Sequence, residues 1–322
     1  AIIGFGNVGQ GLVKILKDRN DILAENLVVQ FSVVAVCDMR LGNFYNPAGL
    51  PLGKLISAAQ EGDLSSLAAN ESGWSVEETI AQADFDPLVE ASFTDLQTGK
   101  PAISYVRQAL RAGKNVVTTN KGPIALYLPE MLKLAQQNNV CIGFEGTVMS
   151  GTPALAIGKE FLAEAIITKI QGILNGTTNY ILTQMENGNS YAEALAEAQL
   201  LGYAEADPSG DVEGYDSAGK VVILSNLLMG TDIAMADIDR EGITRLTVAD
   251  INQAKAKNCR WKLIGTIEMD GNEVIASVRP TKVSLEHPLA SVGGATNAIT
   301  YSTEILGEVT LVGPGAGRLE TG

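Results

Sequence analysis

The stretch AIIGFGNVGQG, which spans residues 1–11, decides the fold of this 322-residue chain. Its apolar start predicts a buried strand, a glycine turn follows, and the next residues carry the apolar stripe of a helix. The turn fits the pattern GxGxxG, whose glycines permit a tight bend, close approach of a pyrophosphate, and close packing of the helix on the sheet. A purely structural turn is the alternative, but the strand before the motif and the helix after it favour a dinucleotide-binding site. The motif consists of Gly4, Phe5, Gly6, Asn7, Val8 and Gly9.

The next apolar stretch, VVQFSVVAVCD at residues 28–38, predicts a second buried strand parallel to the first, and it ends in Asp38. An acid at this place can bind the 2′-hydroxyl of the NAD ribose, whereas a nearby arginine can accommodate the 2′-phosphate of NADP. Arg40 follows in CDMR, and Lys54 is a second candidate cation for the phosphate, although both can equally be surface charges. We therefore expect NADP and keep NAD as the alternative.

Strands and helices alternate as far as about residue 150, which predicts an α/β fold with a Rossmann-type, doubly wound parallel sheet. The pattern then changes. The stretch KLIGTIEMDGNEVIASVRP predicts two strands joined at Asp270 and Gly271, and further extended segments follow. We expect a second, α+β region with a mostly antiparallel sheet.

The composition argues against several classes of protein. Hydrophobic residues make up 46% of the chain, so it can form a core, but no apolar run reaches the roughly 20 residues of a membrane span. The net charge of −14 argues against a nucleic-acid partner, whose phosphates need clustered cations. Three widely separated cysteines and a single histidine, His287, argue against disulfides, a zinc site and a histidine-based mechanism. The cytoplasm is therefore the expected location.

The stretch EADPSGDVEGYDSAGK, residues 205–220, places five carboxylates before one lysine, and a nearly continuous apolar run follows. Asp216 and Lys220 are four residues apart at the predicted start of a helix, a spacing that a plain ion pair also explains. The helix dipole and the apolar run disfavour a charged Lys220 while the carboxylates favour it, so this lysine can exchange a proton near neutral pH. Glu205 and Asp211 lie in the preceding loop and can bind the ammonium group of an amino acid.

Two further polar turns follow predicted strands. Lys121 lies in TTNKGP, where a parallel strand ends, and ligands bind beyond the carboxyl ends of such strands. A solvated loop lysine is the alternative. In ILNGTTNYI, Thr177 or Thr178 is expected to cap a helix, and Gly176 can bring backbone N–H groups to a carboxylate. Capping alone explains this second pattern equally well.

Together these residues resemble homoserine dehydrogenases along nearly the whole chain. The segments that carry the resemblance are, in order, GFGNVGQG, VEAS, ALRAGKNVVTTNKGP, GILNGTTNYIL, GYAEADPSGDVEGYDSAGK and GPGAG, of which the fifth is the most specific. The resemblance implies NAD(P)H-dependent interconversion of L-aspartate 4-semialdehyde and L-homoserine, in the biosynthesis of threonine, methionine and isoleucine.

The resemblance also implies roles for single residues. Lys220 is expected to donate and accept the proton, and Asp216 to orient it. Lys121 is expected near the nicotinamide and the substrate, and Glu205 and Asp211 on the substrate ammonium. The remaining expected contacts are Gly176 and Thr177 with the substrate, and Ser92 and Thr119 with the cofactor.

A monovalent cation, usually sodium, is implied at Glu145, Val148, Ser150 and Thr152, mainly through backbone carbonyls. A homodimer formed through the second sheet is implied as well. We expect residues 1–150 to bind NAD(P), residues 151–304 to bind substrate, catalyse and dimerise, and a segment of about 305–322 to return to the first domain. We also expect residues beyond both ends of the chain, and no threonine-binding regulatory domain.

Two other functions fit part of this pattern. Another NAD(P)-dependent oxidoreductase acting on an amino acid would share most of it. A dinucleotide-sensing regulatory protein would keep the glycine turn but would not need Lys220 among its carboxylates.

Overall fold

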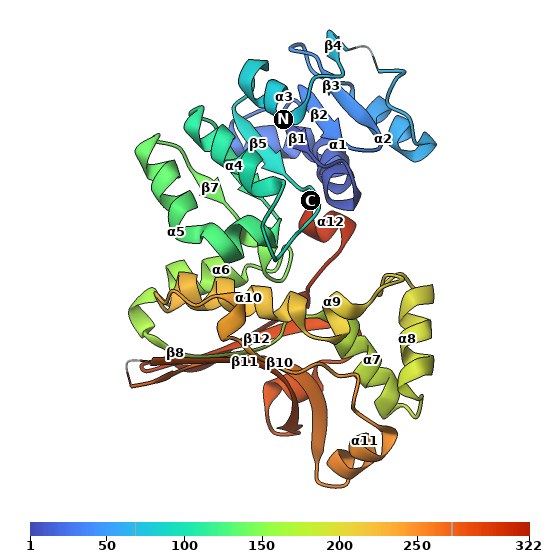
Figure 1. Cartoon of the computed structure of the whole chain (residues 1–322), viewed down its shortest axis with the longest axis vertical. Coiled ribbons are helices and arrows are strands. Elements are labelled where there is room, and N and C mark those ends of the chain that lie inside the picture. Colours follow the sequence, from blue (N-terminus) through green and yellow to red (C-terminus); the bar gives the residue numbers. More distant parts are fainter. Residues whose placement is uncertain (68, 272) are drawn as a thin grey trace. The chain divides into compact units, whose positions relative to one another are not determined.

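The computed structural model describes residues 1–67, 69–271 and 273–322. The chain forms two compact units, the first made of Ala1–Thr147 and Gly317–Gly322 and the second of Val148–Ala316. Each unit contains its own sheet with helices packed on it (Figure 1).

The first unit contains a seven-stranded sheet in the order β4-β3-β2-β1-β5-β6-β7. The five strands from β2 to β7 in this order are parallel, and β3 and β4 add an antiparallel edge. The sheet is therefore of the Rossmann type, as the sequence predicted. Its strands are β1 (Ile2–Ile3), β2 (Ala35–Asp38), β3 (Gly42–Tyr45), β4 (Glu71–Ser72), β5 (Pro87–Glu90), β6 (Asn115–Thr118) and β7 (Ile142–Gly143).

The helices of the first unit pack apolar side chains on this sheet. Val13 and Leu16 of the first helix are buried with Ile2 and Val36 in one cluster. The helices are α1 (Asn7–Leu27), α2 (Leu52–Glu61), α3 (Val76–Gln82), α4 (Ala102–Arg111), α5 (Lys121–Gln137) and α12 (Arg318–Thr321).

Strand β1 lies between β2 and β5, so the chain crosses over in opposite directions on its two sides. Ligands of open α/β sheets bind outside the carboxyl ends of the strands at such a switch point. The glycine turn after β1 lies at this edge, and so do the loops after β5 and β6.

The second unit contains a six-stranded sheet in the order β13-β12-β8-β10-β11-β9. All neighbours in it are antiparallel except β11 and β9. This confirms the mostly antiparallel sheet. Its strands are β8 (Ile167–Ile173), β9 (Asp239–Arg240), β10 (Cys259–Asp270), β11 (Glu273–Ser284), β12 (Thr296–Thr303) and β13 (Gly307–Pro314).

Helix α10 lies along one face of this second sheet (Figure 1). Its residues from Ser217 to Ser225 are all buried. A side chain at Gly265 of β10 would collide with Val221 of α10, so a glycine is needed where helix and sheet meet. The helices are α6 (Ala154–Ala156), α7 (Gly176–Glu186), α8 (Tyr191–Leu200), α9 (Ser209–Val212), α10 (Tyr215–Leu228) and α11 (Val248–Lys255).

The structure differs from the expected local features at two places, whereas the expected hairpin is present. Strand β2 begins only at Ala35, because α1 continues to Leu27 and ends at Val28 in a left-handed conformation. Helix α7 is capped by Asn175, whose side chain accepts from the Thr178 N–H, and not by Thr177 or Thr178. The hairpin is formed by the pairing of Asp270 with Glu273, although Asn272 lies outside the described residues.

The C-terminal segment is divided between the units. Residues 305–316 belong to the second unit, because β13 pairs with β12 over eight residues. Only Gly317–Gly322 lies with the first unit. There α12 packs closely on α1, since a side chain at Gly11 of α1 would collide with the Arg318 backbone. The segment that joins the first unit is therefore shorter than the expected 305–322.

Among the described residues, no helix combines the length and the apolar character that crossing a membrane would require.

Candidate active site

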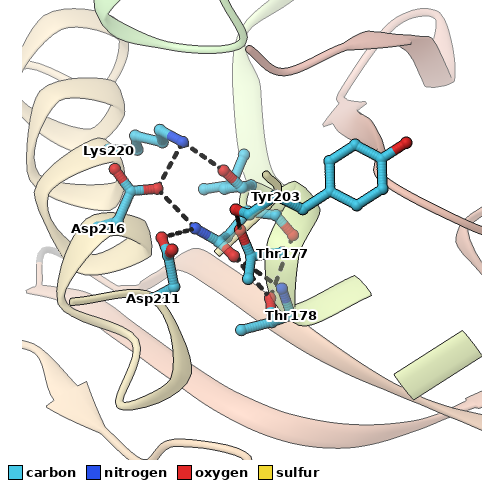
Figure 2. A network of polar contacts seen from close by, with 8 residues as sticks. Thr177, Thr178, Tyr203, Asp211, Asp216 and Lys220 are labelled. Carbon is cyan, nitrogen blue, oxygen red and sulfur yellow. Dashed lines mark hydrogen bonds and ion pairs between the residues drawn. The ribbon is translucent and has the colours of Figure 1, made fainter. Parts of the chain in front are cut away.

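Lys220 is a buried lysine of the second unit, and it belongs to a network of hydrogen bonds with Asp216, Asn175 and Asp211. It lies on α10, one turn after Asp216, and only 6% of it is exposed. Its Nζ donates a hydrogen bond of 2.7 Å to Asp216 Oδ2 and another of 2.5 Å to the Leu174 carbonyl. Figure 2 shows Lys220 and Asp216 side by side on the helix, with dashed lines from Asp216 leading towards Asp211. The expected pairing of Lys220 with Asp216 is thus present.

Asn175 links the two carboxylates of this network. Its Nδ2 donates to Asp211 Oδ1 at 2.6 Å and to Asp216 Oδ2 at 3.0 Å. Its Oδ1 accepts from the Thr178 N–H at 2.9 Å, so the side chain that caps α7 also fixes both acids. The sequence does not point to Asn175 as part of this site, although an asparagine directly before a glycine and a helix is a recognised capping signal.

The network brings two carboxylates close to one another. Asp216 pairs with Lys220, and the Asn175 amide joins Asp216 to Asp211. Burial and the repulsion from Asp216 raise the pKa of Asp211 despite the Asn175 hydrogen bond. An added positive charge would relieve this repulsion, so the network is suited to an ammonium ligand.

The start of α7 borders the network. Gly176 is the first residue of the helix, and a side chain there would lie 2.6 Å from the Ala295 carbonyl. Thr177 is buried, and its hydroxyl donates to the Tyr203 carbonyl at 2.6 Å. Glu205 differs from the other expected substrate residues because it is exposed, and its backbone carbonyl accepts from the side-chain amide of Gln199.

The glycine turn of the first unit has the geometry of a dinucleotide site. Gly4 has a φ of 89°, and a side chain there would collide with the Ala91 backbone. A side chain at Gly9 would collide with the Gly4 carbonyl, whereas one at Gly6 would meet no atom within 4 Å. The open space at Gly6 adjoins the N-terminus of α1, which has no side-chain cap and no acid in its first turn. Free N–H groups facing open space are what a pyrophosphate requires.

Asp38, at the end of β2, is held by three backbone N–H groups. Oδ2 accepts from Phe5 at 2.8 Å, and Oδ1 accepts from Arg40 at 2.9 Å and Leu41 at 3.1 Å. Burial acts to raise the pKa of Asp38, but these donors outweigh it and hold the pKa below its usual range. Arg40 and Lys54 are both exposed.

The loops after β5 and β6 carry Ser92, Thr119 and Lys121. Lys121 is the first residue of α5, whose cap is Asn120, and its side chain is partly buried. Ser92 donates its N–H to Glu90 Oε1 at 2.9 Å. Sequence reasoning missed Glu90, an acid inside the apolar stretch PLVEAS whose isolation was the available signal.

The expected cation residues lie on both sides of the unit boundary, so they are described separately. Glu145 begins a short 3₁₀ turn in the first unit. Val148, Ser150 and Thr152 belong to the second unit and are buried, and Ser150 has a φ of 56°. Within the described residues no group of three His, Cys, Asp or Glu side chains could hold a metal ion. Any cation here would depend on backbone and hydroxyl oxygens, which suit a hard ion.

The chain matches two family descriptions over almost its whole length. Residues 4–145 match "Homoserine dehydrogenase, NAD binding domain", and residues 153–322 match "Homoserine dehydrogenase".

Among curated proteins, an NAD(+)-dependent homoserine dehydrogenase from Pseudomonas canavaninivorans is 46% identical over 100% of this chain and 92% of its own length. The homoserine dehydrogenase from Methanocaldococcus jannaschii is 39% identical over 99% of this chain and 94% of its own.

Solved structures agree with these matches. A putative homoserine dehydrogenase from Archaeoglobus fulgidus has a TM-score of 0.88 and 34% identity, covering 99% of this chain and 94% of that one. A hyperthermophilic archaeal homoserine dehydrogenase mutant in complex with NADPH has a TM-score of 0.84 and 33% identity, covering 100% of this chain and 92% of that one.

Proposed function

The chain belongs to the homoserine dehydrogenase family, and from this membership and the network around Lys220 we propose how its residues carry out the family's reaction. It is an NAD(P)-dependent oxidoreductase that interconverts L-aspartate 4-semialdehyde and L-homoserine. The bound dinucleotide supplies or accepts the hydride. The protein must bind both ligands and move a proton to or from the substrate oxygen.

Lys220 is the proposed proton donor during aldehyde reduction and the acceptor in the reverse direction. The observation that supports this role is its burial together with the 2.7 Å hydrogen bond to Asp216. Asp216 orients the ammonium before transfer through this hydrogen bond. The Leu174 carbonyl fixes a second N–H of Lys220, so the donor is held in one direction.

The substrate ammonium is proposed to bind at Asp211, where it would offset the repulsion between Asp211 and Asp216. Glu205 is the second proposed partner on the strength of the family resemblance alone. The substrate carboxylate is proposed to bind the backbone N–H groups of Gly176 and Thr177 at the start of α7, where the helix dipole favours an anion. In the first unit, Lys121 is proposed to contact the bound ligands.

The cofactor preference is proposed to depend on Asp38. The sequence predicts NADP because of Arg40 and Lys54, and this preference stays a prediction. The fixed carboxylate of Asp38, in contrast, suits a free ribose 2′-hydroxyl. A 2′-phosphate would meet that carboxylate as a like charge. We therefore propose that NAD(H) is preferred, a reading that also agrees with the name of the Pseudomonas relative.

A monovalent cation, sodium in the first instance, is proposed to bind through oxygens of Glu145, Val148, Ser150 and Thr152. The left-handed conformations of Met149 and Ser150, with φ of 59° and 56°, turn successive carbonyls of this segment in different directions. Such a turn can supply several oxygen ligands without a cluster of acids.

A homodimer is proposed to form through the face of the second sheet that points away from α10. Gly265 faces α10, so strand alternation puts Ile275, opposite Glu268, on the other face. Register through β8 and β12 puts Val312 on that face as well. These two side chains are 56% and 57% exposed. Light scattering of the wild type and of Ile275→Arg tests this, because the variant should have the mass of a monomer. A monomeric wild type, or a variant that stays dimeric, would contradict the proposal.

The proposed function is tested by oxidation of NADH and of NADPH with L-aspartate 4-semialdehyde as the second substrate. We expect oxidation of both, with a higher kcat/KM for NADH. Binding of the reduced dinucleotides without any oxidation would overturn the proposal and favour a dinucleotide sensor.

A further inference from the structure

Glu90 is a fully buried acid at the carboxyl edge of the first sheet. It is the last residue of β5, the strand next to β1 at the switch point, and none of its surface is exposed. Isolated buried carboxylates are rare, because burial removes the water that stabilises their charge.

Donors from two loops surround the carboxylate. In the loop after β5, both the N–H and the hydroxyl of Ser92 donate to Oε1, the N–H at 2.9 Å. At the end of β6, the Thr118 hydroxyl donates to Oε2 at 2.9 Å. The Thr119 N–H donates to the backbone carbonyl of Glu90 at 3.3 Å. The Glu90 side chain therefore ties the loop after β5 to the end of the adjacent strand β6, and its backbone carbonyl holds the first residue of the loop that follows.

Asn120 makes a second connection between the same loops. Its N–H donates to the Thr118 hydroxyl at 3.0 Å, and its Nδ2 donates to the Phe93 carbonyl at 2.9 Å. Its Oδ1 accepts from the Gly122 N–H and so caps α5, the helix that begins with Lys121. The position of Lys121 is thus connected to Glu90 through Thr118 and Asn120.

The partners of Glu90 in the described part of the chain are hydroxyls and amides, with no basic side chain among them. Burial raises the pKa of Glu90, and the hydrogen bonds from Ser92 and Thr118 oppose that rise. Such an arrangement is a costly way to stabilise a fold, since an apolar side chain could fill the same space. This favours a local role that requires two acceptor oxygens in fixed positions.

The role of Glu90 follows from the position of the loops after β5 and β6 at the carboxyl edge of the sheet. A Rossmann-type sheet binds one half of a dinucleotide on each side of its switch point. Asp38 is the last residue of β2, on the adenosine side, so the loops after β5 and β6 lie on the nicotinamide side. These loops carry Ser92, Thr119 and Lys121.

We propose that Glu90 is a positioning residue for the nicotinamide half of the cofactor. Its carboxylate holds the loop of Ser92 and the loop of Thr119 and Lys121 in the arrangement that receives the dinucleotide. This inference rests on the proposed function in so far as it assumes that NAD(P)H is the ligand of the first unit. Glu90 itself need not touch the cofactor.

The test compares Glu90→Met, which keeps the volume but removes both acceptors, with Glu90→Gln, which keeps one acceptor and adds one donor. The dissociation constant of NADH is measured by fluorescence titration, and the unfolding midpoint in urea is measured on the same samples. We expect Glu90→Met to raise the NADH dissociation constant by about tenfold or more, the equivalent of one lost charge-assisted hydrogen bond. Glu90→Gln should stay within about threefold of wild type, since it can re-form most of these bonds.

Thr79→Val is the matched control, because Thr79 is a buried polar residue of the same unit whose hydroxyl donates to the Ser75 carbonyl instead. It should lower the unfolding midpoint without changing NADH binding. Should Glu90→Met fail to fold, Thr118→Val removes the donor to Oε2 while sparing Glu90, and it should also weaken NADH binding by several-fold, about the effect of one buried hydrogen bond.

A folded Glu90→Met with wild-type NADH affinity would overturn the proposal, and so would wild-type affinity in Thr118→Val. An equal loss of affinity in Thr79→Val would reduce Glu90 to a general stability role. A wild-type protein that binds NADH but does not oxidise it would contradict the proposed function and leave the role of Glu90 in binding intact.

Discussion

Lys220 Nζ lies 2.7 Å from Asp216 Oδ2, and the two residues are one helical turn apart near the start of α10. Only 8% of the Lys220 side chain and 19% of the Asp216 side chain are exposed, so the pair is shielded from solvent. The dipole at a helix N-terminus opposes a cation, and the hydrogen bonds to Asp216 and the Leu174 carbonyl offset that effect. The ammonium group of Lys220 is therefore held in a fixed position, whereas that of a surface lysine would be mobile.

Asp216→Asn should lower kcat with little effect on the KM for the semialdehyde, because the amide keeps the shape but loses the charge-assisted hydrogen bond that orients Lys220. We expect a loss of about 10²-fold in kcat, the lower range for a group that assists proton transfer. Steady-state kinetics of reduced-nicotinamide oxidation measure this. Asp232→Asn, at an exposed position of the same unit, is the control and should be neutral. Equal kcat in Asp216→Asn and wild type would contradict the orienting role.

Asp211→Asn should stabilise the fold at neutral pH while it impairs substrate binding. Because burial and Asp216 raise the folded-state pKa of Asp211, the unfolded chain releases this proton at a lower pH than the folded protein does. Stability is therefore lost as pH rises from about 4 through the folded pKa, and the asparagine variant avoids that loss. We expect a higher free energy of unfolding than in wild type at pH 7, and no such difference below about pH 4.

Urea unfolding of Asp211→Asn and wild type at several pH values measures this difference, and kinetics on the same samples measure KM. A higher KM together with a higher stability is the expected signature. A variant that is less stable at pH 7 would show that Asp211 serves the fold and not the ligand.

Asn179 and Asn297 should respond differently to truncation, although both are fully buried in the second unit. Asn179 accepts from Lys262 Nζ at 3.0 Å and donates to the Thr296 carbonyl at 3.0 Å. Among the described residues, neither polar atom of the Asn297 side chain has a partner. Asn179→Ala should therefore cost more free energy of unfolding than Asn297→Ala, by about 1–3 kcal/mol. Thermal or urea unfolding measures the difference, and equal losses would show that Asn297 has partners in solution.

Lys262 should make stability depend on alkaline pH. Its Nζ is buried and donates to the Val292 carbonyl at 2.7 Å, and burial lowers its pKa to about 8. Between that value and the unfolded pKa near 10.4 the unfolded chain binds more protons, so stability rises with pH in this window.

Lys262→Met removes this contribution. The free energy of unfolding of wild type minus that of the variant should therefore increase by up to about 3 kcal/mol from pH 8 to pH 10.5. Taking this difference removes the effect of other titrating groups, because both proteins contain them. A difference that stays constant with pH would show that Lys262 keeps an ordinary pKa in the folded protein.

Local patterns allowed much of this architecture to be predicted. The turn at Gly4, the helix carrying Lys220 and the hairpin ending at Asp270 each depend on neighbours in the sequence, and the structure contains all three. The Lys220–Asp216 pair was predictable for the same reason, since residues four apart share one face of a helix.

Contacts between distant segments were not predictable in this way. Asn175 reaches Asp211 and Asp216 across 36 and 41 residues, and Glu90 reaches Thr118 across 28. Such contacts depend on how strands are ordered in a sheet and how helices pack on it, which one sequence does not specify residue by residue. Two errors had local causes. Strand β2 is short because α1 continues to Leu27, and α7 is capped by Asn175 directly before Gly176 and not by the threonines that follow.

The most direct test of this account compares Lys220→Ala with wild type in the oxidation of NADH by L-aspartate 4-semialdehyde, with the NADH dissociation constant measured on both proteins. If Lys220 transfers the proton, kcat should fall by about 10² or more while NADH binding changes little, because the lysine and the dinucleotide turn belong to different units. Full turnover by a folded Lys220→Ala would contradict the assignment and require another proton donor.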